Sequence, residues 1–191
     1  MAKSSGGTRI AKLSSGRTSD TQTTEKNVFS GYSSTEWEHT AFFEETGGVL
    51  VTSRERLNEA KRDSTKPDGG NAYKIYQKEK RMCLNFAKFG FRIEHVARPS
   101  SLDTADVVVR KTPNGRIYVN GMLADLKSLS SQNNVVQKAS YAIHHQGAKI
   151  VLFEFTNKDK KAKILEKIAE CRRKGFHGYY YFTGDKTAVS F

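Results

Sequence analysis

Two stretches of the chain decide its fold: residues 105–109, which read Ala-Asp-Val-Val-Val, and residues 120–127, which read Asn-Gly-Met-Leu-Ala-Asp-Leu-Lys. Each is predicted to be a short strand that carries one acid, Asp106 or Asp125. Successive side chains of a strand point to opposite faces, so Asp125 and Lys127 are expected on one face and Leu126 on the other. Carboxylates and an ammonium gathered at strand ends suit a divalent ion and an attacking water. Taken alone, however, Asp-x-Lys is usually a solvated pair on an exposed strand.

The helix predicted upstream of these strands supplies a third acid. Residues 72–89 have an apolar stripe that includes Tyr76 and Cys83, and Gly90 follows as an end signal. Glu79 lies three residues after Tyr76 and four before Cys83, which places it inside the stripe. A carboxylate there is costly unless it is paired or binds a metal. Two explanations of Glu79 stay open. It could form a salt bridge to a lysine or arginine at the edge of the core, or it could act beside the strand acids.

The rest of the pattern predicts an α/β fold, in which helices flank a mixed central β-sheet. The run at 148–155 is almost continuously apolar, so it is expected to be a strand buried on both faces. Asn-Gly pairs predict a hairpin turn at 112–115 and a second bend or bulge at 120–121. The other expected helices are 53–62, 133–146 and 158–174, and the expected strands are 49–51, 91–96, 106–110, 117–129, 148–155, 178–182 and 187–191.

Composition divides the chain into three parts. Residues 1–34 contain 17 Ser, Thr or Gly and few apolar groups, so they are predicted to be a disordered tail. Residues 35–46 are predicted to form a short helix or linker that ends at Gly47 and Gly48. Residues 47–191 form one domain, long enough to bury a core of its own.

The positive charge is concentrated in that domain. Residues 1–46 carry five bases and six acids, which leaves 27 bases and 14 acids, a net charge of +13, for residues 47–191. A domain this basic commonly binds a polyanion, because neutralised phosphates release their counterions. The alternative is an ordinary soluble surface rich in lysine. No apolar run is long enough to span a bilayer, and no basic helix has bulky apolar residues opposite its charges.

Two further features bear on the compartment. The N-terminus has no apolar stretch typical of a signal peptide, so a cytoplasmic location is expected. Delivery as part of a phage or secreted system stays open. Cys83 and Cys171 are far apart in predicted helices, which favours two reduced core thiols, and no Cys/His spacing suggests zinc.

The order of these residues resembles the core of the PD-(D/E)xK nuclease superfamily. More narrowly, residues 47–191 are similar to the C-terminal tRNA-nuclease domains of contact-dependent growth inhibition toxins and to related domains of phage and mobile elements. Ala105 stands where the family motif has proline. The stretches that carry the resemblance are 78–83 (KEKRMC), 90–94 (GFRIE), 104–108 (TADVV), 120–127 (NGMLADLK) and 146–152 (QGAKIVL).

The resemblance implies a restriction-endonuclease-like core and a metal-dependent mechanism. By position, Glu79, Asp106 and Asp125 would hold one or two Mg²⁺ or Mn²⁺ ions, with the Leu126 carbonyl as a further oxygen ligand. Lys127 would orient the attacking water or stabilise charge on the phosphate. The implied catalytic set is therefore Glu79, Asp106, Asp125 and Lys127.

Nucleic-acid contacts are expected from the helix at 133–146. Gln137, Tyr141 and His144 are spaced i, i+4, i+7 opposite its apolar side, although a solvated polar face is an equal alternative. His144 and His145 point about 100° apart, which disfavours them as an acid–base pair for metal-free cleavage. The basic residues expected to contact phosphates are Arg92, Arg98, Lys111, Arg116 and Lys138.

The leading hypothesis is therefore a divalent-metal-dependent endonuclease, with tRNA or other structured RNA favoured over DNA. The alternative is a non-catalytic nucleic-acid-binding or phage or mobile-element structural module on the same fold. The resemblance also allows a cognate immunity protein as a partner. Neither a membrane partner nor a particular oligomeric state is implied.

Overall fold

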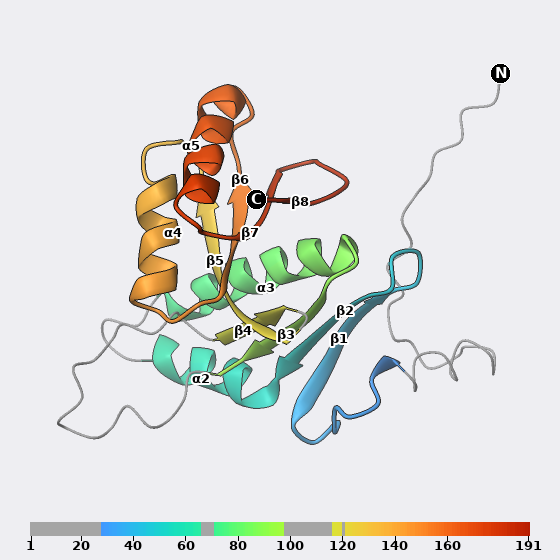
Figure 1. Ribbon diagram of the computed structural model, residues 1–191. Helices are drawn as coiled ribbons and strands as arrows, with labels where there is room; N and C mark the ends of the chain where they lie inside the picture. The colour runs from blue at the N-terminus through green and yellow to red at the C-terminus, as the bar shows by residue number, and fades with distance from the viewer. Residues whose placement is uncertain (1–27, 66–70, 98–115, 120) are drawn as a thin grey trace.

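The computed structural model describes residues 28–65, 71–97, 116–119 and 121–191 as an α/β fold (Figure 1). Its eight strands form one mixed sheet, and the described helices are labelled α2 to α5. None of these helices is both long and apolar enough to cross a lipid bilayer. The elements in chain order are β1 (Trp37–Phe43), β2 (Gly48–Ser53), α2 (Arg54–Ser64), α3 (Ala72–Lys88), β3 (Arg92–Val96), β4 (Arg116–Val119), β5 (Met122–Leu129), α4 (Val135–His144), β6 (Ile150–Phe155), α5 (Lys161–Arg173), β7 (Gly178–Phe182) and β8 (Val189–Ser190).

The strands lie in the sheet in the order in which they occur in the sequence. Parallel pairs are β2 with β3, β5 with β6 and β6 with β7, and the remaining neighbours are antiparallel. A parallel pair needs a long connection, and each of these connections contains a helix: α2 and α3, then α4, then α5. The predicted mixed sheet with flanking helices is confirmed.

The helices cover opposite faces of the sheet, and β6 is buried between them. All six residues of β6 are buried. Leu152 belongs to a core cluster with Cys83 of α3, whereas Val151 belongs to a second cluster with Ala139 of α4 and Ile164 of α5. Figure 1 shows α4 and α5 side by side, apart from α2 and α3. The run at 148–155 is thus a strand buried on both faces, as its composition predicts.

The helix predicted at 35–46 is wrong, because β1 occupies most of that segment. β1 pairs with β2 through a tight turn, in which Gly47 has a φ of +71°. Gly48 is the first residue of β2, and a Cβ there would lie 1.7 Å from the Ala87 carbonyl oxygen of α3. The two glycines therefore serve a hairpin and a close helix contact, and they do not end a helix.

Residues 28–34 lie against the sheet, on the face that α3 does not cover. Phe29 is buried, and its ring stacks on that of His39 with centroids 4.4 Å apart. Tyr32 donates a hydrogen bond to Glu94 of β3. The rest of the predicted disordered tail, residues 1–27, lies outside the described residues.

The single strand predicted at 117–129 is two strands. β4 and β5 pair antiparallel around residues 120–121, and Gly121 has a φ of +83°. Gly121 therefore lies in a hairpin turn between Val119 and Met122, where only a bend or bulge was expected. The strand expected at 106–110 and the turn expected at 112–115 lie outside the described residues.

The remaining elements agree with the predictions to within a few residues at their ends. Ser53 caps α2, because its hydroxyl accepts a hydrogen bond from the Arg56 backbone N–H. Cys83 and Cys171 are both buried free thiols, as expected.

Candidate functional site

β5 presents Asp125 and Lys127 on one face of the sheet, as the alternation of a strand requires. In the register with β6, Asp125 lies opposite Val151 and Lys127 opposite Phe153. Both β6 residues belong to the core cluster that α4 and α5 cover. Asp125 and Lys127 therefore face the side of α4, and Leu126 packs with the cluster on the α3 side.

The two side chains form an ion pair away from bulk water. Lys127 Nζ lies 2.5 Å from Asp125 Oδ2, and the exposed fractions of the side chains are 17% and 4%. Burial raises the pKa of the Asp125 carboxyl above its ordinary value, against the lowering effect of the Lys127 charge. Asp125 is therefore a carboxyl group whose charged form depends on its cationic neighbour.

A third residue, Gln146, fixes the lysine. Lys127 Nζ donates a hydrogen bond to Gln146 Oε1 at 3.2 Å. Gln146 follows the end of α4, where its backbone N–H donates to the Tyr141 carbonyl. The ammonium is thus held between a strand carboxylate and a helix-end amide. Sequence reasoning missed Gln146, because a single glutamine after a helix carries no signal of its own.

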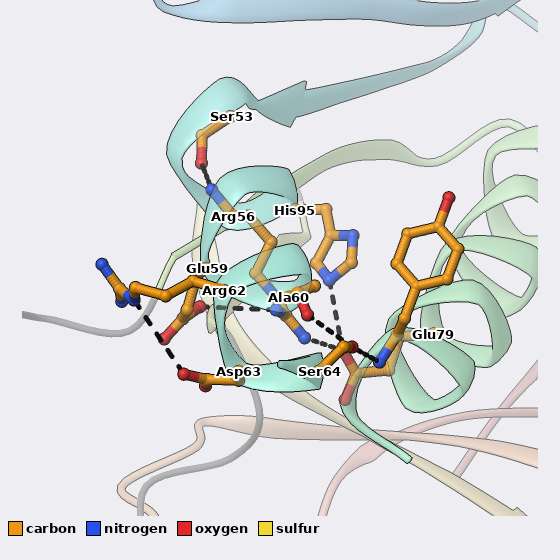
Figure 2. Close-up of polar contacts among 10 residues, drawn as sticks. Ser53, Arg56, Glu59, Ala60, Arg62, Asp63, Ser64, Glu79 and His95 are labelled. Carbon is orange, nitrogen blue, oxygen red and sulfur yellow. Dashed lines mark hydrogen bonds and ion pairs between the residues drawn. The ribbon is translucent and has the colours of Figure 1, made fainter. Parts of the chain in front are cut away.

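Glu79 faces inward from α3, as predicted, and its carboxylate is engaged by α2 and β3 (Figure 2). Arg56 Nη2 donates to Glu79 Oε2 at 2.9 Å, and His95 Nε2 lies 3.3 Å from the same oxygen. Arg56 Nη1 also lies 3.4 Å from Glu59 Oε2. The arginine is buried, with 2% of its surface exposed. Of the two roles left open for Glu79, the structure contains the salt bridge.

His95 completes this cluster as a neutral imidazole. It is fully buried, and burial lowers its pKa below the ordinary value even though Glu79 acts in the opposite direction. Its ring stacks on Tyr76 with centroids 5.4 Å apart, and the Arg56 guanidinium lies 5.3 Å from the same Tyr76 ring. Neither Arg56 nor His95 was expected at the site, and their separation from Glu79 in sequence explains why.

The two clusters lie on opposite faces of the sheet, and the charge of Glu79 still acts on Asp125. The negative charge of Glu79 contributes to the raised pKa of Asp125, and the positive charge of Lys138 on α4 lowers it. β3 ends at Val96, and its partner β4, which pairs with β5, begins at Arg116. The described sheet therefore has fewer strands beyond Asp125, and Glu79 acts on Asp125 near that place.

The structure describes three of the four residues that were predicted to share one pocket. Asp125 and Lys127 are brought together, Glu79 is held by Arg56 and His95, and Asp106 lies outside the described residues. Within the described ranges, no three His, Cys, Asp or Glu side chains lie close enough together to hold a metal ion.

The residues predicted to contact nucleic acid lie mainly on α4. Gln137, Lys138 and His144 are exposed, and Tyr141 is half-buried. The His144 ring packs edge-on against Phe176, at 5.7 Å between centroids. Arg98 lies outside the described residues.

Three further basic residues were predicted to contact phosphates. Arg92 is exposed but lies against the N-terminal segment, where its Nε donates to Tyr32 and its Nη2 donates to the Val28 carbonyl. Arg116 begins β4, and Lys111 lies outside the described residues. Arg92 is therefore a structural contact of residues 28–34.

A second buried carboxylate, Glu154, was not predicted. It interrupts the apolar run of β6 and is fully buried. Arg81 donates to it at 2.6 Å, and Ser128 and Tyr181 each donate at 2.9 Å. Asn85 donates in turn to the Tyr181 hydroxyl. This hydrogen-bonded network joins α3 to β5, β6 and β7.

Comparison with known proteins gives no match: no family model, curated protein or solved structure is similar to the chain. The resemblance to PD-(D/E)xK nucleases therefore stays a prediction from the residues quoted above. The chemistry open to the site is that of a buried Asp–Lys pair, a hydrogen-bonding amide and a second carboxylate within electrostatic range.

Proposed function

We propose that the chain is a metal-dependent endonuclease that cleaves phosphodiester bonds of nucleic acid, with tRNA or another structured RNA as the first candidate substrate. The observation that carries this proposal is the buried pair of Asp125 and Lys127 on β5. The proposal includes the finer assignment of β3, β4, β5, α4 and β6 to a restriction-endonuclease-like core.

Lys127 has the chemistry to bind and stabilise a phosphate. Its ammonium is fixed by Asp125 and Gln146 and keeps partial exposure, so one of its N–H groups can turn to an anionic oxygen. A preorganised cation in a partly desolvated place stabilises developing negative charge better than a mobile surface lysine. Lys138 adds positive potential on the same side.

The donor set also suits a hard divalent ion. Mg²⁺ is commonly bound through one or two carboxylates together with substrate phosphates and water, and Asp125, beside Lys127, would be one of them. Asp106 would be the second, as the resemblance implies, and Glu79 would join them only if it left its contacts with Arg56 and His95. A bound Mg²⁺ or Mn²⁺ ion would polarise the phosphoryl group and acidify a water molecule.

A second candidate function has its own support. Glu79 is already paired with Arg56 and hydrogen-bonded by His95, as in a structural cluster. This arrangement favours a non-catalytic nucleic-acid-binding or structural module on the same fold, in which the acids hold no ion.

Cleavage assays distinguish the two candidates. The full chain is incubated with tRNA, single-stranded RNA, and single- and double-stranded DNA, with Mg²⁺, Mn²⁺ or EDTA. The variants are Asp125→Ala and Lys127→Ala, and Lys163→Ala, an exposed lysine of α5, is the matched control. Circular dichroism confirms that each variant is folded.

An endonuclease cleaves at least one substrate only with the metal, and its rate falls by orders of magnitude in the two site variants but not in the control. Nucleic-acid binding that EDTA does not change, without cleavage of any substrate, supports the module. Cleavage by Asp125→Ala at the wild-type rate contradicts the proposed site.

A further inference from the structure

Next to the Asp125–Lys127 pair, α4 ends in two stacked rings. Tyr141 and His145 lie four residues apart, and their rings are nearly parallel, with an interplanar angle of 24° and centroids 5.1 Å apart. Tyr141 is half-buried, whereas His145, the C-cap residue of α4, is exposed. One side of the His145 ring therefore rests on Tyr141, and the residue remains open to solvent.

Backbone hydrogen bonds join the residues that carry these rings to Gln146 of the candidate site. The backbone N–H groups of His145 and Gln146 both donate to the Tyr141 carbonyl. The Gln146 side chain accepts from Lys127, which pairs with Asp125. The stacked pair is thus one residue away from the group that holds the site's ammonium.

The surroundings of the rings favour an anionic polymer. Residues 126–153, which include the end of β5, all of α4 and the start of β6, contain no Asp or Glu, although the chain has 20 of them. Lys138 lies on the same helix, three residues before Tyr141 and seven before His145, and its charge reaches Asp125. A phosphate chain that runs along this stretch meets its cations and neutral polar groups, and no carboxylate from residues 126–153.

An exposed flat ring and a lysine contact different parts of a nucleotide. Lysine binds phosphates in single and double strands alike, whereas a ring stacks on a base only where the base face is free. In a duplex, both faces of each internal base are covered by its neighbours. A stacking position beside the site therefore selects for an unpaired base.

We propose that His145, supported by Tyr141, is a specificity-determining stacking position for an unpaired base next to the phosphate bound at Lys127. This inference rests on the proposed function and deepens it, because it names the substrate class as single-stranded or looped nucleic acid. An aromatic pair spaced i, i+4 also stabilises a helix slightly, so the test measures base binding separately from stability.

The experiment is equilibrium binding in EDTA, which excludes turnover. A short fluorescein-labelled RNA is measured single-stranded and annealed to its complement, against the full chain. His145→Ala removes the ring, and His145→Phe keeps a flat ring. His177→Ala, which removes an exposed histidine before β7, is the matched control.

Wild-type protein is expected to bind the single strand more tightly than the duplex. His145→Ala is expected to lose about tenfold or more in affinity for the single strand, with the duplex affinity unchanged. His145→Phe restores the single-strand affinity, and His177→Ala does not change it. Equal losses for both forms of RNA, no loss in His145→Ala, or a wild-type preference for the duplex overturns the inference.

The same preparations with Mg²⁺ separate this inference from the proposed function. Single-strand binding that depends on His145, without cleavage, leaves the stacking position intact and refutes the endonuclease. Cleavage that depends on Asp125, with single-strand binding indifferent to His145, supports the endonuclease and refutes the stacking position.

Discussion

The Asp125 carboxyl group of β5 is almost completely buried, and the Lys127 ammonium lies beside it. Its raised pKa means that, between the unfolded and folded pKa values, the folded protein binds more protons than the unfolded chain. The free energy of unfolding that this group contributes is therefore present at low pH and is lost as the pH rises through the folded pKa.

Asp125→Asn should remove this dependence, because the amide does not titrate and still offers an oxygen to Lys127. We expect the stability of the wild type, relative to the variant, to fall as the pH rises from about 3 to about 7. Chemical denaturation of both proteins over a series of pH values measures the difference. A difference that is constant with pH contradicts the burial of the Asp125 carboxyl.

Arg56 compensates two carboxylates at once, Glu59 and Glu79. Arg56→Met should leave Glu79 near a neutral imidazole with no cation in contact, which for a buried pair costs about 3–5 kcal/mol of stability. The double variant Arg56→Met, Glu79→Gln should recover part of this loss, because the uncompensated charge is gone. Urea denaturation of the single and double variants gives the coupling energy.

Arg62→Ala is the matched control for this cycle, since Arg62 lies on the same helix with a largely exposed side chain. Its effect is expected within about 0.5 kcal/mol of zero. If the Arg56→Met variant is as stable as this control, Arg56 does not hold Glu79 in the manner described.

At the scale of the elements, β1 shows where local sequence signals are too weak to decide. Residues 35–46 are preceded by Ser34, which together with Thr35 and Glu36 is a typical helix start, and they are followed by Gly47 and Gly48. Capping preferences contribute about 1 kcal/mol, and burial of Phe42 and Phe43 in a strand paired with β2 outweighs them. By contrast, the strong apolar periods of α3 and α4 and the apolar run of β6 predicted those elements correctly.

Gly48 lies where the β1–β2 hairpin packs against α3, and this close packing requires a residue without a side chain. Gly48→Ala places a methyl group within 1.7 Å of the Ala87 carbonyl, so the helix or the strand must move. We expect a loss of at least about 3 kcal/mol or failure to fold, because backbone atoms cannot turn aside as a side chain can. Thermal denaturation and soluble yield measure the effect.

Gly47→Asn is the control for this hairpin. Gly47 has a φ of +71° and open space around its Cβ position, and asparagine tolerates that conformation. Its cost is expected to be about 1 kcal/mol or less. Equal stability of the two variants would mean that α3 does not press on β2 at Gly48.

The end of α4 contacts the Asp125–Lys127 pair through Gln146. If the chain is the proposed endonuclease, Gln146→Ala frees one side of the Lys127 ammonium, and we expect kcat to fall about 10- to 100-fold with little change in thermal stability. Gln146→Glu keeps an oxygen acceptor and should retain more activity than the alanine variant. An alanine variant with wild-type kcat would show that Asp125 alone positions the lysine.

At the scale of the whole molecule, the sequence predicted the class of fold and the pairing of Asp125 with Lys127. It did not predict the pairing of Glu79 with Arg56. Strand alternation places Asp125 and Lys127 together, since that relation depends only on positions two residues apart. Which helix covers which face depends on how the chain crosses the sheet, so no local pattern could predict that Glu79 and Asp125 lie on opposite faces. The Arg56–Glu79 pair spans 23 residues and is likewise a consequence of packing α2 on α3.

The distribution of charge leads to a prediction for the molecule as a whole. Residues 47–191 carry a net charge of +13, and the stretch 126–153 around the site is free of acids. Binding of single-stranded RNA in EDTA should therefore weaken as salt rises, with log K falling linearly against log[salt] by about 0.7 for each phosphate neutralised. Lys138→Ala should make that slope shallower by about 0.7, the amount expected for one phosphate contact. His145→Ala should weaken binding at every salt concentration and leave the slope unchanged, because stacking releases no counterions. Fluorescence anisotropy from about 50 to about 200 mM salt measures both slopes. An affinity that does not depend on salt would contradict this prediction. So would a slope that changes in His145→Ala and not in Lys138→Ala, because Lys138 is expected to contact phosphate and His145 to stack on a base.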